Sequence, residues 1–249
     1  MPNLTVAVIG PAGYAGHLGK KGTASDLTFY NQKRDRITVT YIEPSRYPER
    51  VSSLFFAVSM AEMALLVVDE ITPAFGESVL MLDAAGIGKG FMVLLNYLSP
   101  DQVMPLVKGT VVGNYPIVPD DHNQLRETFL LLAEQQPARG VGMQHGSVPV
   151  DHFFPVKGVG TVVLGGVAEG RIRVHDELRV FPTSRVAHVR SIQKHDDDVT
   201  EAAAGDRVGL ALKGVEADDL DRGHVLSNDP SLVVSSILNG RVELVRYWP

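Results

Sequence analysis

The chain has 249 residues, of which 45% are hydrophobic and 21% are charged, with a formal net charge of −6 and no cysteine. These values suit one large or two modest globular domains and exclude disulfides and thiolate metal sites. The negative charge argues against a protein whose whole surface binds nucleic-acid backbone. No apolar run is long enough for a membrane span and no signal peptide is present, so we expect a cytoplasmic protein with no membrane or DNA partner.

The amino-terminal half alternates between apolar runs and amphipathic stretches. Buried strands are predicted at Leu4–Ile9, Ile37–Ile42, Ala64–Val68, Phe91–Leu95 and Thr110–Pro119. Helices are predicted from near Ser25 or Asp26, and at Glu49–Met60, Ala74–Ala85 and Asn123–Gln136. Strands and helices in this order predict a parallel α/β sandwich over residues 1–140.

A glycine-rich segment, Gly10–Lys21, follows the first strand. A strand, such a loop and a helix are the setting of a phosphate-binding loop. The spacing departs from that motif, because counting back from Gly19-Lys20 puts Tyr14 at the first glycine position, and Lys21 replaces the magnesium-binding hydroxyl. Two interpretations stay open: a turn that packs a strand onto a helix, or a degraded phosphate site made by Gly10, Gly13, Gly16, Gly19 and Lys20.

Residues 146–229 predict a small all-β barrel, because short runs rich in Val and Ile alternate with polar residues and end at Gly, Pro or Asp. Strands are expected at Thr161–Val167, Glu177–Phe181, Arg185–Gln193, Arg207–Leu212 and His224–Leu226. The Gly- and Pro-rich stretch Pro137–Pro149 marks the domain boundary. Asn239-Gly240, between Leu232–Leu238 and Val242–Trp248, predicts a C-terminal β-hairpin over residues 230–249.

Motifs in the barrel carry a family resemblance. Gly158-Val-Gly-Thr-Val-Val-Leu-Gly165, Ala204-Gly-Asp-Arg-Val-Gly-Leu210, Lys213-Gly-Val215 and Asp221-Arg-Gly223 resemble, in this order, the second domain of elongation factors of the elongation factor Tu superfamily. Phe154-Pro-Val-Lys-Gly158 and Ser191-Ile-Gln-Lys-His195 are most similar to the selenocysteine-specific elongation factor of the archaeal type. The resemblance implies a shortened, P-loop-NTPase-like G domain, a domain II β-barrel and no full third domain.

The same resemblance implies that nucleotide contacts are missing. Glu43, Arg46 and Tyr47 fall on the Asp, Gly and His of the family's second motif, and too few residues precede Glu43 for the family's switch segment and extra strand. Asn96 matches the guanine-reading Asn-Lys-x-Asp motif, but Ser99 replaces its Asp and cannot reproduce a bidentate contact. We therefore expect no cofactor and no catalytic residue. GTP with magnesium, and a GTPase activity, are the alternative.

The resemblance also implies a ligand pocket in the barrel. Asp151, His152 and Arg207 look like the trio that the archaeal and eukaryotic selenocysteine factor places around its amino acid, with Phe154 close by in sequence. An Arg and a His can bind an anionic selenolate or another small acidic group, with Asp151 orienting the His. The rival interpretation is structural, with Asp151 and Arg207 as an ion pair at a barrel seam and His152 exposed.

Three functions compete at this point. The chain is a translation protein without GTP hydrolysis that binds tRNA, an aminoacyl end or a translation partner, or a GTPase with an atypical site, or a protein–protein scaffold. A cluster of barrel cations is either a nucleic-acid patch or a solvated face: Arg171, Arg173, Arg179, Arg185, Arg190 and Lys194. The histidines lack metal-ligand spacing, so we expect no metal site. The C-terminal hairpin is a candidate contact for a homo-oligomer.

Overall fold

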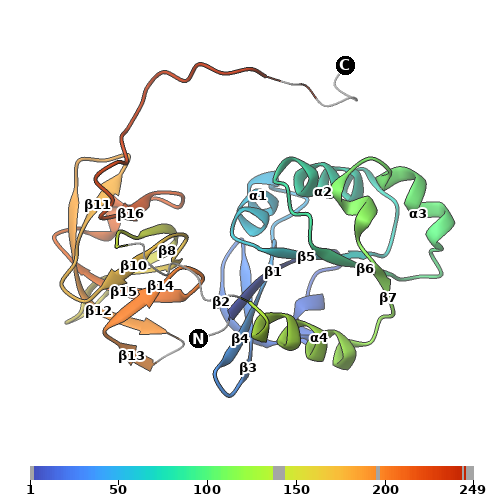
Figure 1. Ribbon diagram of the computed structural model, residues 1–249, viewed down its shortest axis with the longest axis horizontal. Helices are drawn as coiled ribbons and strands as arrows, with labels where there is room; N and C mark the ends of the chain where they lie inside the picture. Colours follow the sequence, from blue (N-terminus) through green and yellow to red (C-terminus); the bar gives the residue numbers. More distant parts are fainter. Residues whose placement is uncertain (1–2, 137–143, 195–196, 243, 245–249) are drawn as a thin grey trace. The chain divides into compact units, whose positions relative to one another are not determined.

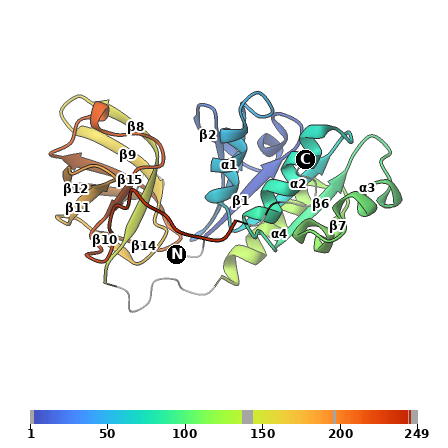
Figure 2. The same ribbon diagram turned by 90° about the horizontal axis from the view of Figure 1, so that it is seen from above.

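The computed structural model describes residues 3–136, 144–194, 197–242 and 244. The chain divides into two compact units, Met1–Ala138 and Arg139–Pro249. The first is a mixed sheet covered by helices and the second is a β-barrel (Figures 1 and 2). The expected combination of an α/β fold and an all-β fold is therefore confirmed.

A mixed sheet forms the centre of the first unit. Its strand order is β2-β3-β4-β1-β5-β6-β7, in which β3 pairs antiparallel with both β2 and β4 and the pairs from β4 to β7 are parallel. The bounds are β1 Asn3–Ile9, β2 Lys20–Ala24, β3 Thr28–Arg34, β4 Ile37–Glu43, β5 Met63–Val68, β6 Gly90–Leu94 and β7 Ile117–Val118. The central strands β1 and β5 are apolar along most of their length because helices cover both faces.

Helices lie on both sides of this sheet: α1 Val51–Ser59, α2 Pro73–Ala84, α3 Pro100–Val107 and α4 His122–Glu134. On one face, α1, α2 and α3 pack Leu54, Val79 and Val103 into the core, and α4 packs Phe129 onto the other (Figure 1). Short 3-10 turns are η1 Tyr14–His17, η2 Val111–Asn114 and η3 Ala217–Asp219. None of the helices in the described part of the chain has the length and apolar character that a membrane span requires.

The predicted helix near Ser25 is wrong. The structure has the β2–β3 hairpin there, and Thr28–Arg34 pairs with β4 over its whole length. Thr28, Phe29 and Tyr30 favour a strand, and Phe29 is buried beside Ala57 of α1. The expectation that no extra strand fits before Glu43 is therefore also wrong, because β3 is present and a helix after the glycine-rich segment is not.

A second expectation is wrong in part. The predicted strand Thr110–Pro119 is the 3-10 turn η2 followed by the two-residue strand β7. Pro116 and Pro119 flank β7, and a proline cannot donate to a strand ladder, which limits its length. Helix α3 was not expected from periodicity, although Ser99-Pro100 with Gln102 is a capping box that marks its start.

The second unit is a closed barrel. The strand order is β11-β16-β8-β9-β15-β12-β13, and pairing of β11 with β12 closes the ring. The bounds are β8 Ser147–Val156, β9 Gly160–Gly166, β10 Arg171–Arg173, β11 Glu177–Phe181, β12 Val186–Lys194, β13 Asp197–Val199, β14 Glu201–Ala203, β15 Arg207–Lys213 and β16 Val225–Ser227. Alternate residues such as Leu178, Val180, Leu210 and Leu212 point inward and form one core, as the alternating sequence pattern predicts.

The predicted C-terminal hairpin is not formed in the part that the structure describes. Residues 228–242 and 244 contain no strand, and the remaining residues of the expected hairpin lie outside the described ranges. Arg179 donates from Nη2 to the main-chain oxygen of Asp229, at 2.5 Å, at the start of this segment. Further on, Val233 and Leu238 are 81% and 96% exposed. A two-stranded hairpin without a packed face is marginally stable, which accounts for the extended segment.

Candidate functional site

A bulge in strand β8 carries Asp151 into the barrel. The register between β8 and β9 shifts between Val150 and His152, so Asp151 is the additional residue of the bulge. Val150 and Asp151 are both 2% exposed, which breaks the alternation of inward and outward residues. Val150 pairs with Gly165, where a Cβ atom would lie 2.4 Å from the Pro149 oxygen. Glycine at this position therefore allows the bulge.

Arg207 binds the buried carboxylate with two nitrogen atoms. Its Nη1 donates to Asp151 Oδ2 at 2.5 Å and its Nη2 donates to Oδ1 at 3.1 Å. Arg207 is the first residue of β15 and pairs with Gly166 of β9, so two neighbouring strands fix the geometry of the pair. Bidentate arginine–carboxylate pairs of this kind are the strong, orientation-specific ones.

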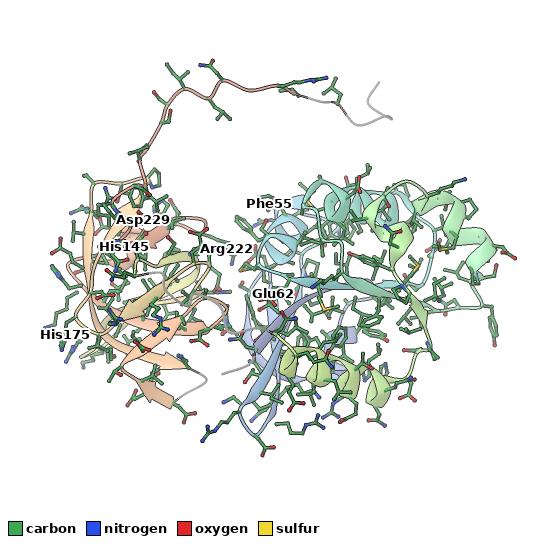
Figure 3. All side chains as sticks on the ribbon, in the orientation of Figure 1. Phe55, Glu62, His145, His175, Arg222 and Asp229 are labelled. Atoms are coloured by element: carbon green, nitrogen blue, oxygen red, sulfur yellow. The ribbon has the colours of Figure 1, made fainter. Side chains whose placement is uncertain are left out.

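His152 and Arg222 complete the cluster around Asp151. His152 Nδ1 lies 2.8 Å from Asp151 Oδ1, and its side chain is 12% exposed. Arg222, labelled in Figure 3, donates from Nε to the main-chain oxygen of Asp151 at 2.8 Å. One guanidinium and one imidazole thus contact the carboxylate, and a second guanidinium contacts the main-chain oxygen of the same residue. The cluster therefore joins hydrogen-bond donors from β8, from the start of β15 and from the segment before β16 around Asp151.

The pKa of the Asp151 carboxyl is lowered in the folded chain. Burial by itself would raise it, but the Arg207 guanidinium and the hydrogen bonds from His152 and Arg207 together outweigh burial. The carboxylate therefore stays ionised at neutral pH and positions Arg207 and His152. It does not serve as a proton donor.

The structure brings three of the predicted pocket residues together. Asp151 and Arg207 form the ion pair of the structural interpretation, but His152 is not exposed as that interpretation required. Phe154 follows His152 at a spacing of two on β8 and is 41% exposed, so it lies on the outward face of the strand. Arg222 was not among the predicted residues, although it belongs to the Asp221-Arg-Gly223 motif.

The barrel cations have partners within the barrel. Arg171 and Arg173 pair with Glu201, Arg185 pairs with Asp219, and Lys194 pairs with the buried Asp206. Arg179 and Arg190 donate to main-chain oxygens. These contacts favour the interpretation of a solvated, self-paired face over a patch of uncompensated charge. Any anion that binds here competes with existing partners.

In the first unit, the loop after β1 contains the predicted glycine-rich segment. Gly10 and Gly13 have φ of 154° and 85°, a range that favours glycine. The loop leads into the single turn η1, so the N-terminus of a long helix is not available to an anion. The N–H groups of Gly13 and Ala15 donate to Glu43 Oε1 and Oε2 at 2.7 and 3.1 Å. A side chain of the protein itself thus binds the loop.

The other residues of the predicted degraded phosphate site do not lie at the start of a long helix. Gly16 belongs to η1, and a Cβ atom on Gly19 would lie 3.0 Å from the Asn31 backbone, so Gly19 allows close packing of β2. Lys20 is exposed in β2 and pairs with Asn31. It stands in the edge strand and not at the start of a helix, where the lysine of a phosphate loop would stand.

Two of the positions that align with the family's guanine-reading motif also form hydrogen bonds within the fold. Asn96 Nδ2 donates to the main-chain oxygen of Asp69 at 3.1 Å. The main-chain N–H of Ser99, which stands in place of the Asp, donates to Gln102 Oε1 at 2.9 Å in the capping box of α3. Tyr97, in place of the Lys, is fully exposed. None of these three side chains supplies a carboxylate for a base.

The aspartates of the loop before α4 also have hydrogen-bond partners within the fold. Asp121 caps α4 by accepting from the N–H groups of Asn123 and Gln124, both at 3.0 Å. Asp120 accepts from the Tyr14 hydroxyl at 2.6 Å. Burial and this hydrogen bond raise the pKa of Tyr14. The two aspartates therefore stabilise the fold in this loop.

Known proteins resemble this chain over nearly its whole length. The family model described as elongation factor Tu domain 2 matches residues 160–227. An uncharacterized protein of Methanocaldococcus jannaschii is 44% identical over 238 residues, which are 95% of this chain and 76% of that protein. The selenocysteine-specific elongation factor of the same organism is 30% identical, over 92% of this chain and 53% of its own length. The chain belongs to the elongation factor Tu superfamily.

Solved structures of the superfamily share the fold. Translation elongation factor SelB from Methanococcus maripaludis, in complex with the GTP analogue GppNHp, matches with a TM-score of 0.77 at 26% identity, over 91% of this chain and 55% of that protein. A bacterial selenocysteine-specific elongation factor has a TM-score of 0.74 at 22% identity, which shows the fold alone. The chain is thus an elongation-factor-like protein related to SelB, and it spans about half the length of these relatives.

Proposed function

We propose that this superfamily member has lost GTP hydrolysis and acts as a binding module for the aminoacyl end of a tRNA. Its ligand site is the cluster of Asp151, His152 and Arg207. The observation that supports this proposal is the nearly fully buried Asp151 carboxylate, which holds a guanidinium and an imidazole beside the β8 bulge. A selenolate, a carboxylate or another small acidic group suits these donors.

The first unit supports the loss of GTP hydrolysis. The positions that align with nucleotide contacts serve the fold: Glu43 binds the loop, Ser99 caps α3 and Lys20 lies in an edge strand. Removing one catalytic donor commonly costs about 10²–10³ in rate. Several such losses abolish turnover even where they are not additive. A GTPase with an atypical site is the alternative.

The exposed C-terminal segment favours a second candidate, a protein–protein scaffold. Its apolar side chains are more than half exposed: Val233, Val234, Ile237, Leu238, Val242 and Leu244. Exposed apolar residues in one segment are typical of contact sites. A scaffold needs neither the Asp151 cluster nor RNA. The two candidates therefore differ in tRNA binding, which decides between them.

A gel-shift assay with aminoacylated and deacylated tRNA tests the proposal. We expect a salt-sensitive shift that is stronger with aminoacylated tRNA and weaker in Arg207→Ala. The matched control is Arg185→Ala, because Arg185 is a barrel arginine whose own side chain is 58% exposed. Absence of a shift at low salt would favour the scaffold.

A further inference from the structure

Glu43 is a buried carboxylate that accepts hydrogen bonds from backbone N–H groups of the glycine-rich loop. It is the last residue of β4 and is 6% exposed. Oε1 accepts from Gly13 N–H at 2.7 Å and Oε2 accepts from Ala15 N–H at 3.1 Å. Within the described ranges, no lysine, arginine or histidine forms a salt bridge with Glu43. A buried charge requires compensation, and here backbone N–H groups provide it.

The loop has the geometry of an anion-binding concavity. Gly13 adopts φ 85° and ψ −1°, in the left-handed region, immediately before the turn η1. A left-handed residue beside right-handed ones makes neighbouring N–H groups converge on one point, as in phosphate-binding nests. In this chain the group at that point is the Glu43 carboxylate. The burial of Tyr30 and the negative charge of Glu43 raise the pKa of Tyr30, which shows that the charge is close to this ring.

We propose that the Glu43 carboxylate replaces a phosphate group in this loop and keeps phosphate out. The contact is autoinhibitory, because a triphosphate needs the same N–H groups. It also takes over a structural role, tying the carboxyl end of β4 to the loop after β1. This inference rests on the proposed loss of GTP hydrolysis. It names the Glu43 carboxylate as one reason why phosphate does not bind. Side-chain length matters, since an aspartate is one methylene shorter and does not reach as far.

Inorganic tripolyphosphate is the probe, with the full chain as wild type and as Glu43→Ala, Glu43→Asp and Glu43→Gln variants. We expect no effect of tripolyphosphate on the Tm of the wild type. Glu43→Ala lowers the Tm by several degrees, and tripolyphosphate raises it again in a saturable manner. The backbone amide signals of Gly13 and Ala15 in NMR spectra move in Glu43→Ala and return towards their wild-type positions when tripolyphosphate binds. Glu49→Ala, at an exposed glutamate of the same unit, is the control and behaves like the wild type.

Glu43→Gln keeps the shape of the side chain and removes its charge. It replaces Glu43→Ala in the tripolyphosphate titration if Glu43→Ala does not fold. Glu43→Asp keeps the charge on a shorter side chain, so its Tm shows how much of the stabilisation depends on side-chain length. The inference is overturned if wild-type Gly13 and Ala15 amides respond to tripolyphosphate, or if neither Glu43→Ala nor Glu43→Gln gains a response to it. Calorimetry of the wild type with GTP is a separate test. GTP binding there contradicts the proposed function, whereas absent GTP binding with unresponsive variants contradicts only the role of Glu43.

Discussion

Arg207 and Asp151, which are far apart in sequence, form a bidentate ion pair at 2.5 and 3.1 Å between the first residue of β15 and the bulge of β8. The pair does two things at once. It satisfies a buried carboxylate, and it presents a guanidinium beside His152 at the point where β8 leaves its regular register. The structural and the functional interpretations of these residues are therefore compatible, because the ion pair positions the donors of the site.

Removing the arginine is expected to destabilise the barrel. Arg207→Ala leaves the Asp151 carboxylate buried without its main partner, which costs about 3–5 kcal/mol in such pairs. Arg207→Lys keeps the charge but loses the second hydrogen bond, so its loss is smaller. Urea denaturation followed by circular dichroism measures the free energy of unfolding. Arg185→Ala, the control at an exposed arginine, is expected to cost only about 0–1 kcal/mol. Equal losses for Arg207→Ala and Arg185→Ala would contradict the role of the pair.

The free energy of unfolding is expected to decrease in acid because the Asp151 carboxylate becomes protonated. Its pKa in the folded chain lies below the ordinary value of 3.8, so its ionisation contributes stability that is fully present above that value. The contribution is lost as the pH falls through the lowered pKa of the folded chain. Unfolding free energies measured from neutral pH down to pH ~3 show this slope, which starts near that ordinary value. Asp151→Asn is less stable at neutral pH and has a shallower slope. An unchanged slope in Asp151→Asn would show that other carboxylates dominate.

Two adjacent glycines make a matched test of the bulge. A Cβ atom at position 165 would lie 2.4 Å from the Pro149 oxygen and 2.7 Å from Val148 Cγ1, whereas one on Gly166 meets nothing within 4 Å. Gly165→Ala is expected to cost about 1–3 kcal/mol, as other overpacking substitutions do. Gly166→Ala is expected to stay within about 0.5 kcal/mol of the wild type. Thermal denaturation compares the two variants. Similar Tm values would mean that the bulge adapts to a methyl group.

The wild-type chain is expected to show no magnesium-dependent binding of GTP or GDP in isothermal titration calorimetry. The physical reason is that Glu43 and Ser99 are hydrogen-bonded within the fold at the positions that align with the family's nucleotide contacts. Ser99→Asp alone restores no binding, because it supplies one base contact and no phosphate site. Saturable binding of GTP in the micromolar range by the wild type would revive the GTPase alternative.

Periodicity predicts the larger features of this fold well. The apolar runs identify the parallel strands β1, β4, β5 and β6, and the alternating runs identify the barrel. The errors lie where local pattern is ambiguous. Residues 28–34 lack a clear period of two, and their strand is formed by pairing with β4 over its whole length. Leu232–Leu238 has a strand pattern, but the described part of the C-terminal segment has no neighbouring strand or core that would stabilise a hairpin.

The site is harder to predict than the fold because its contacts join distant residues. The family resemblance identifies Asp151, His152 and Arg207, but the alternation along β8 gives no sign that Asp151 points inward, since a bulge changes the register. The contact of Glu43 with Gly13 spans a separation of 30 residues. The sequence analysis only aligns that glutamate with the Asp of the family's second motif. The structure gives it a partner.

The central claim is that the barrel binds the aminoacyl end of a tRNA and that this binding does not require GTP. Filter binding of aminoacylated tRNA to the wild-type chain, with and without GTP and magnesium, tests this most directly. The account predicts the same Kd in both conditions, weaker binding of deacylated tRNA, and weaker binding of the aminoacylated tRNA by Arg207→Ala. Binding that requires GTP, or no binding of either tRNA at low salt, would contradict it.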